Sequence, residues 1–119
     1  MKSVTDLVPN PSEFNYEVLK YANRVGVEFH RSKVAEAMAN YFNLSPEARR
    51  KRTKGGNDIC YEHRTFRALS NFTRYGGLLR RTRRGHYEIT GVGRREISRL
   101  KGPITFHYIK KNYRYIPKN

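Results

Sequence analysis

The chain has 119 residues, enough for one domain with one modest hydrophobic core. Hydrophobic residues make up 37% of it, so a folded state is expected although 29% of the residues are charged. No apolar run approaches the length of a membrane span, and residues 1–14 lack the apolar centre of a signal peptide. Cys60 is the only cysteine, which excludes an internal disulfide.

The charge balance narrows the choice of partner. Twenty-five Lys and Arg residues face 10 Asp and Glu residues, for a net charge of +15. Repulsion on that scale opposes the folding of a small domain, so a polyanionic partner is the simplest explanation, and nucleic acid is the first candidate. No basic segment has the continuous bulky apolar face that insertion into a membrane surface needs, so no membrane partner is expected.

The N-terminal third predicts a lead-in, a helix and a short strand. Residues 1–12 contain two prolines and little periodicity, which favours a mobile segment. Apolar side chains then recur at helical spacing at Phe14, Val18, Tyr21, Ala22 and Val25. These predict a helix that begins at Glu13 and stops at Gly26, followed by one short strand over Val27–His30.

The next segment predicts two helices and a basic loop. Ser32 is suited to cap a helix whose apolar face holds Val34, Ala37, Met38, Tyr41 and Phe42. Ser45-Pro46-Glu47 is typical of a second helix start, with a cap, a proline in the first turn and an acid near the positive end. The following "ARRKRTKGGN" has almost nothing apolar to bury, so we expect a short helix that leads into a flexible basic loop.

A long helix is predicted over Ile59–Tyr75, with Asn57 or Asp58 as its cap. One side of this helix collects Ile59, Phe66, Leu69 and Thr73. The opposite side collects the polar stripe Arg64, Arg67, Asn71 and Arg74. The pair Gly76-Gly77 supplies a left-handed exit from the helix.

A hairpin follows, with strands at Leu78–Thr82 and His86–Thr90 and with Gly85 providing the positive φ of a tight turn. The side chains expected to face inward are Leu79, Tyr87 and Ile89. Four arginines surround the turn, and we expect no acid near them: Arg80, Arg81, Arg83 and Arg84.

The C-terminal part is less sharply patterned. Val92–Leu100 predicts a last helix. After Gly102-Pro103, the stretch "ITFHYIKKNYRYIPKN" is compatible with a second hairpin, with an extended tail, or with the first strand of a further domain. We therefore treat residues 103–119 as an aromatic and basic extension of a domain that spans residues 13–102.

The predicted order of elements is that of an α+β winged helix-turn-helix domain, with three to four helices, a short strand and a C-terminal β-hairpin wing. In this arrangement the third helix enters the major groove, and the hairpin reaches the DNA backbone or the minor groove. Arginines at the tip of such a wing meet phosphates or the focused negative potential of a narrow minor groove. The order therefore supports binding to double-stranded DNA.

The stretches "NYFNLSPEARRKR", "YEHRTFRALSNFTRYGGLLRRTRRGHYEIT" and "GVGRREI" resemble the N-terminal domain of Mrr-type restriction endonucleases. The similarity covers most of Phe14 to Ile97. Its most specific parts are the glycine before Leu78-Leu79, the hairpin from Arg83 to Thr90, and Gly93-Arg94-Arg95. The resemblance implies a winged helix that delivers DNA, often modified, to a separate C-terminal nuclease domain of PD-(D/E)XK type. We accordingly expect a cytoplasmic protein encoded by a bacterium, an archaeon or a phage.

The sequence departs from the family in three places. A tryptophan-alanine pair that is frequent in the third helix aligns here with Phe66-Arg67, and the segment after Leu44 is more basic than usual. Residues 102–119 are too few to hold a nuclease domain, so this chain is expected to be the recognition part of an endonuclease without catalytic residues of its own.

Candidate DNA-binding residues fall in three groups. Arginine and asparagine side chains can form paired hydrogen bonds with guanine and adenine in the major groove, and residues near the start of a recognition helix often reach the groove first. The recognition-helix candidates are Asn57, Tyr61, His63, Arg64, Arg67, Asn71 and Arg74. The wing candidates are Arg80, Arg81, Arg83, Arg84 and His86. The basic-loop candidates are Arg50, Lys51, Arg52 and Lys54.

No cofactor or metal site is predicted. The ten acids are scattered and form no strand pair of the kind a metal-dependent nuclease needs. Cys60 and His63 have one half of a zinc spacing without a second pair. The many tyrosines favour half-buried core positions, and an aromatic pocket for a methylated or flipped base is the alternative.

Two other functions remain open from the sequence. A free-standing winged-helix transcriptional regulator would need a dimer surface, which the aromatic tail from Phe106 to Tyr115 could supply, so a homodimer is one arrangement to test. An RNA-binding protein is the second, since small and very basic chains are common in that class and exposed tyrosines can stack on single-stranded bases.

Overall fold

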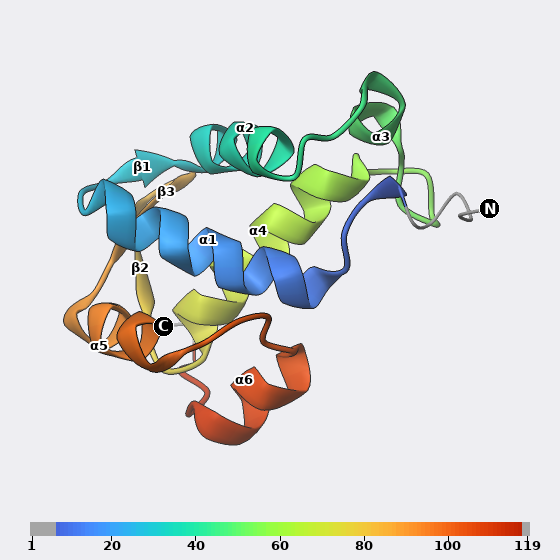
Figure 1. The fold of residues 1–119 in the computed structure, drawn as a ribbon. Coiled ribbons are helices and arrows are strands. Elements are labelled where there is room, and N and C mark those ends of the chain that lie inside the picture. Colours follow the sequence, from blue (N-terminus) through green and yellow to red (C-terminus); the bar gives the residue numbers. More distant parts are fainter. Residues whose placement is uncertain (1–6, 118–119) are drawn as a thin grey trace.

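The computed structural model describes residues 7–117 and contains six helices and three strands within that range (Figure 1). In chain order they are α1 (Pro11–Val25), β1 (Phe29–His30), α2 (Arg31–Tyr41), α3 (Pro46–Arg50), α4 (Cys60–Arg74), β2 (Leu79–Arg83), β3 (His86–Ile89), α5 (Gly91–Arg99) and α6 (Phe106–Asn112). The prediction of an α+β, winged-helix-like fold is confirmed.

The three strands form one antiparallel sheet in the order β1-β3-β2. Leu79 of β2 pairs with Ile89 of β3, and both are buried. Two residues further toward the tip, Arg81 pairs with Tyr87, whose other neighbour is Phe29 of β1. We call the β2–β3 hairpin, residues 79–89, the wing. Its turn has Gly85 at φ +76°, as the sequence predicted.

The helix predicted from Glu13 is α1, which begins two residues earlier. Asn10 caps it by accepting a hydrogen bond from the Glu13 amide, and Pro11 occupies the first turn, where the missing amide costs nothing. Gly26 ends the helix at φ 73°, as predicted. The apolar face of α1 is fully buried through Phe14, Val18, Leu19 and Ala22.

Between α1 and α2, the predicted strand is confirmed in shortened form and the predicted cap is wrong. The strand expected over Val27–His30 has only its last two residues, Phe29 and His30. The cap of α2 is His30 rather than Ser32, because the His30 Nδ1 atom accepts a hydrogen bond from the Ser32 amide at 3.1 Å. Ser32 instead places its hydroxyl oxygen 2.8 Å from the same ring nitrogen.

The segment between α3 and α4 is folded rather than the flexible loop that we expected. Ser45 caps α3 as predicted. After α3, the Thr53 amide donates to the Asp58 carbonyl at 2.9 Å, and the Cys60 amide donates to the Lys51 carbonyl at 2.7 Å. The chain therefore doubles back on itself before α4. Neither Asn57 nor Asp58 caps this helix, since its N-cap is Ile59, which makes no side-chain capping bond.

Helix α4 lies against α1 and α2 with one face buried. That face consists of Cys60, Thr65, Ala68, Leu69 and Phe72. The predicted apolar side was correct for Leu69, but Phe66 and Thr73 lie at the margin, half-buried. The true buried face is therefore rotated around the helix from the predicted one, and the outward face is rotated with it.

The C-terminal part is a helix and an extended segment, so the hairpin alternative is wrong. Thr105 caps α6 by accepting from the Tyr108 amide at 3.0 Å. Ile104, Ile109 and Tyr113 are buried in the same apolar cluster as Phe14. The predicted mobile lead-in lies partly outside the described residues, and its described part includes the buried Val8.

No helix among residues 7–117 has both the length and the apolar composition needed to cross a membrane.

The start of α5 requires glycine at one position. A Cβ atom on Gly93 would lie 2.1 Å from the Leu78 carbonyl oxygen, which also accepts hydrogen bonds from the amide and hydroxyl of Thr90. We therefore expect Gly93→Ala to lower the free energy of unfolding by about 1–3 kcal/mol, because a backbone atom must move. Gly91→Ala, in the same turn with its nearest neighbour at 3.7 Å, is the matched control.

Urea denaturation of the two variants measures this difference. A Gly93→Ala protein as stable as the Gly91→Ala protein would contradict the close contact.

Candidate nucleic-acid interface

The outward face of α4 carries a polar ridge. His63, Arg67 and Ser70 are exposed and follow one another at spacings of four and three residues, so they lie in line along the helix. Arg74 continues this line one turn further and is half-buried. The predicted stripe contained two of these residues, Arg67 and Arg74. Ser70 was missed because the buried face had been placed too far around the helix.

Arg64, another member of the predicted stripe, is bound to the N-terminal segment. Its guanidinium donates to the Val8 carbonyl at 2.9 Å and also to the Pro9 carbonyl. These bonds hold the segment before α1 against the start of α4. Asn71, the remaining member of the predicted stripe, is half-buried on the same side of α4 as Arg64. Together with His63 and Arg67, they border a hollow of about 270 Å³ that Pro11, Asn15 and Phe106 complete.

The wing arginines fall into two pairs. Arg80 forms an ion pair with Glu88, and the Arg83 Nε atom lies 3.1 Å from a carboxylate oxygen of Glu28. The expectation that no acid lies near the four arginines is therefore wrong for these two. Arg81 and Arg84 are exposed, and no acid among residues 7–117 forms an ion pair with either.

Glu28 reaches the wing from the turn before β1. The hydrogen bond from the Thr82 hydroxyl, at 2.5 Å, and then the bond from Arg83 lower the pKa of the Glu28 carboxyl below its ordinary value. Glu28 therefore keeps its negative charge at neutral pH, and the pair with Arg83 persists there. The positive charge that the wing offers to a ligand is accordingly concentrated at Arg81 and Arg84.

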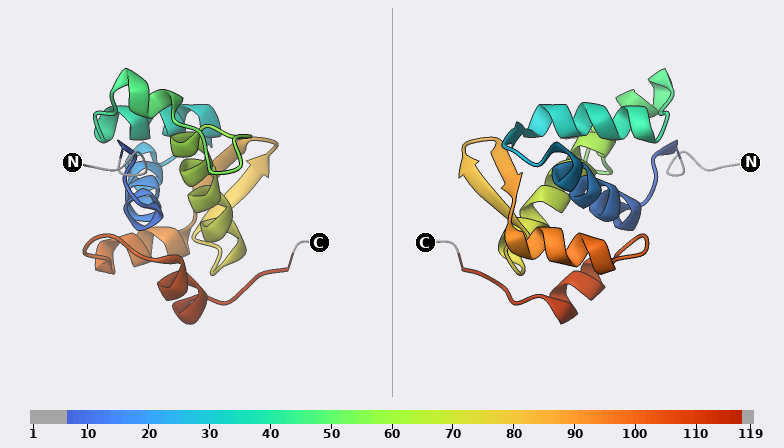
Figure 2. Two further views of the ribbon diagram at one scale, coloured as in Figure 1. Left: turned by 90° about the vertical axis from the view of Figure 1, so that its right-hand side faces the viewer. Right: turned by 60° about the vertical axis from the view of Figure 1, so that its left-hand side comes forward.

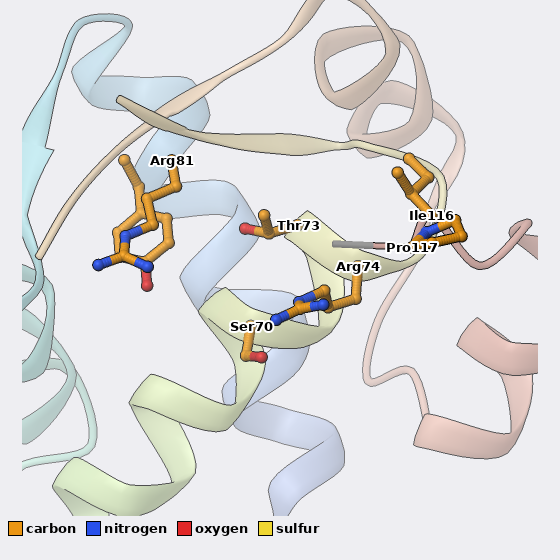
Figure 3. Close-up of a pocket in the computed structure, with 7 residues that line it drawn as sticks. Ser70, Thr73, Arg74, Arg81, Ile116 and Pro117 are labelled. Carbon is orange, nitrogen blue, oxygen red and sulfur yellow. The ribbon is translucent and has the colours of Figure 1, made fainter. Parts of the chain in front are cut away.

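Arg81 lies on the face of the wing that looks toward α4. Alternate residues of a strand share a face, so Arg81 follows the buried Leu79 on the same side, and it pairs across the hairpin with Tyr87. Between this face and α4 lies a hollow of about 250 Å³ (Figure 3). Its lining residues are Ser70, Thr73, Arg74, Arg81, Tyr87, Ile116 and Pro117. Of these, the sequence had indicated only the two arginines as binding residues.

The doubled-back loop before α4 forms a separate basic hollow of about 560 Å³ next to the first turn of the helix. Its lining residues are Lys51, Arg52, Thr53, Lys54, Cys60, His63 and Arg64. The structure thus brings three of the four predicted loop residues next to the start of α4. The fourth, Arg50, is exposed at the end of α3, and Asn57 is exposed in the loop.

Arg31 is a cation at this surface that sequence reasoning missed. Its guanidinium carbon lies 4.9 Å from the centre of the Phe66 ring, and its amide donates to the carbonyl of Gly85 in the wing turn at 2.8 Å. Arg31 therefore stands between α4 and the wing tip. In the sequence, only the position of Arg31 between a predicted strand and a predicted helix could have indicated that it lies at this surface.

The remaining two candidates are partly enclosed. His86 is half-buried, with its Nδ1 atom 3.0 Å from the Arg84 carbonyl oxygen and its ring 4.8 Å from that of His30. Tyr61 is half-buried at the start of α4, and burial raises the pKa of its phenol, which therefore stays neutral. The side chains of His86 and Tyr61 are therefore less available to a ligand than the exposed arginines.

Helix α4, the wing and the C-terminal segment lie on one side of the molecule, and α1 lies on the other (Figure 2, left). Residues 7–117 contain no group of three or more His, Cys, Asp or Glu side chains placed to hold a metal ion. The surface is thus a cationic face with hydroxyl and amide donors, suited to hydrogen bonding and charge pairing with an extended anion.

The profile of the Mrr N-terminal domain matches residues 12–99, well over half of the chain. The match covers most of the winged-helix-like fold, and the chain belongs to the family of N-terminal domains found in Mrr-type restriction endonucleases. The resemblance seen in the sequence is thereby confirmed. Neither a curated protein nor a solved structure matches the chain.

Substitutions at Arg64 and Arg67 should distinguish an arginine that stabilises the fold from one that is free to contact a ligand. Replacing Arg64 with Ala removes two hydrogen bonds to main-chain carbonyls, and because the side chain is half-exposed we expect a loss of about 1–2 kcal/mol in the free energy of unfolding. Replacing the exposed Arg67 with Ala should change it by less than about 0.5 kcal/mol. Equal stabilities in urea denaturation would contradict the role given to Arg64.

Proposed function

We propose that the chain binds double-stranded DNA and acts as the target-recognition module of a restriction endonuclease. The observation that carries the proposal is the arrangement of cations on one side of the fold: the ridge of α4, Arg81 and Arg84 of the wing, and the basic loop before α4. Membership in the Mrr N-terminal domain family supports the same reading. A net charge of +15 suits a polyanion, and among residues 7–117 no acid forms an ion pair with Arg81 or Arg84 of the wing.

The geometry favours a duplex over a single strand. A helix with a polar outward ridge fits the width of the major groove of B-DNA, and a hairpin beside it can reach the adjacent backbone. A single-strand binder would instead need several exposed aromatic rings in a groove. Tyr87 in the wing and Tyr61 in α4 are half-buried. The more exposed Tyr41 and Tyr115 lie on other elements and pack against the rings of Phe42 and Tyr75, so α4 and the wing present no row of free rings.

The residues divide into two roles. Arg67, at the centre of the ridge, is the candidate for contact with base edges, because it is exposed and lies away from the loop and from the wing. Arg84 at the wing tip and Lys54 in the loop are exposed near turns, where they would meet phosphates. Base contacts specify the sequence, whereas phosphate contacts position the protein on it.

The first prediction from this function concerns salt. If about six phosphates are neutralised, the logarithm of the binding constant should fall against the logarithm of salt concentration with a slope of about −5. Arg84→Ala should weaken binding about equally on all sequences and make the slope shallower by about 0.9. Fluorescence anisotropy with labelled duplexes measures both, and a salt-independent affinity would contradict the proposal.

Arg67→Ala should behave differently from Arg84→Ala. We expect it to lower the preference among duplex sequences, by about 1–3 kcal/mol at the position read, while weak sequence-independent binding remains. A library selection with the wild-type and variant proteins measures this preference. An unchanged preference would remove Arg67 from the reading surface, and tighter binding to an RNA hairpin than to any duplex would contradict the proposal as a whole.

Base modification is the finer part of the proposal. We expect one modified version of a duplex to compete best when unmodified, N6-methyladenine and C5-modified cytosine versions of the same library are compared. Equal competition by all versions would remove dependence on modification and leave duplex binding intact.

A further inference from the structure

The hollow between α4 and the wing has walls of two different chemistries. On the polar side it is lined by the guanidinium groups of Arg74 and Arg81 and by the hydroxyl of Ser70. On the other side it is lined by Ile116 and Pro117, which come from the C-terminal segment (Figure 3). A hollow for a plain inorganic anion would need only the polar side, so the apolar wall needs its own explanation.

The C-terminal segment is held in place by the main chain. We call residues 113–117 the strap. The Gly76 amide donates to the Arg114 carbonyl at 2.8 Å, and the Ile116 amide donates to the Arg74 carbonyl at 2.6 Å. The second bond satisfies a carbonyl in the last turn of α4, which has no partner inside the helix. The strap therefore occupies a defined position across the end of the recognition helix.

Ile116 is anchored at one side and open at the other. A Cβ atom on Gly77 would lie 3.3 Å from the Ile116 Cδ1 atom, so Ile116 packs where α4 passes into the wing. The side chain nevertheless remains 44% exposed, in a hollow that Arg74 and Arg81 also line, and neither arginine forms an ion pair with an acid among residues 7–117. A ligand that filled the hollow would cover this exposed apolar side chain.

The ligand that suits both walls is a nucleotide unit of the DNA backbone. A phosphate accepts the charge-assisted hydrogen bonds of guanidinium groups, and the carbon edge of deoxyribose is apolar. Resting on the proposed function, we propose that this hollow binds one phosphodiester of duplex DNA, with Arg74 and Arg81 sharing a single phosphate and with Ile116 and Pro117 packed against the neighbouring deoxyribose. The strap is then a third DNA-contacting element beside α4 and the wing.

Sharing of one phosphate has a measurable signature. Counterion release counts the phosphates neutralised, so two arginines on one phosphate contribute about 0.9 to the slope of log affinity against log salt, not twice that value. Removing one arginine leaves the phosphate partly neutralised by the other. Arg74→Ala and Arg81→Ala should therefore each change the slope by less than 0.9, and the double variant by about 0.9.

Binding of two separate phosphates would give a different change in the salt slope. If each single variant makes the slope shallower by about 0.9 and the double variant by about 1.8, the two arginines bind separate phosphates and the shared site is overturned. The affinities of the same four proteins form a double-mutant cycle, in which the proposal predicts non-additive losses and separate sites predict additive ones.

The apolar wall is tested with Ile116→Ser, measured with the same duplex. We expect binding to weaken about threefold to tenfold, because the apolar contact with the sugar is lost, with an unchanged salt slope, because no charge is removed. Val92→Ser is the matched control, since Val92 is similarly exposed at 37% but lies on α5 and lines no part of the hollow. Urea denaturation confirms that both variants are folded.

The outcomes separate this inference from the proposed function. Duplex binding by the wild-type protein with an unaltered affinity in Ile116→Ser overturns the strap contact and leaves DNA binding standing. Absence of duplex binding by the wild-type protein overturns both.

Discussion

The burial of one face of α4 beneath α1 is the constraint on which the rest of the structure depends. Phe72, Leu69 and Ala68 of α4 are fully buried, and so is Phe14 of α1. Burying a large apolar side chain contributes about 1.5–3 kcal/mol, so this contact fixes the rotation of α4 about its own axis. With the rotation fixed, the side chains of His63, Arg67 and Ser70 point outward. The polar ridge of α4 is thus a consequence of core packing.

The wing is bonded to the rest of the fold both at its base and at its turn. The Leu78 carbonyl accepts two hydrogen bonds from Thr90, and the lack of a side chain on Gly93 lets α5 approach that carbonyl closely. At the turn, the Gly85 carbonyl accepts a hydrogen bond from the Arg31 amide at 2.8 Å, and the Glu28 carboxylate accepts from Thr82 and Arg83. Arg84 remains exposed there. These contacts set the angle of the hairpin and leave the Arg84 side chain exposed at its turn.

Charge is distributed unevenly over this frame. In a chain with a net charge of +15, Glu28 and Glu88 neutralise two of the four wing arginines. These pairs lie on exposed side chains and contribute little to stability, but they limit the repulsion within the hairpin. They also leave the positive potential of the wing on Arg81, which faces α4, and on Arg84, at the tip. The cationic face is therefore narrower than the count of arginines indicates.

Much of the fold could be predicted from the sequence because the spacing of apolar residues and the positions of turn-forming glycines are local signals. The spacing of Phe14, Val18 and Ala22 gave α1, and Gly26 and Gly85 marked its end and the wing turn. What the sequence did not reveal was set by contacts between distant residues. Glu28 and Arg83 are 55 positions apart, so no local pattern pairs them.

The other errors have the same physical origin. A histidine cap at His30 lies outside the usual set of capping side chains, and the loop before α4 is closed by main-chain bonds that leave no trace in side-chain identity. Residues 106–112 include strand-forming types, yet they form α6 because Thr105 caps that helix and Ile109 is buried in the core. The wall formed by Ile116 could not be foreseen for the same reason.

The central claim, that one face built from α4, the wing and the strap binds duplex DNA, is tested most directly by titrating ¹⁵N-labelled protein with a short duplex and following the backbone amide resonances. The account predicts that the largest shifts occur at Arg67, Ser70, Arg84 and Ile116. Shifts centred instead on the opposite hollow, which Tyr16 and Tyr41 line together with Glu13 and Glu17, would contradict it.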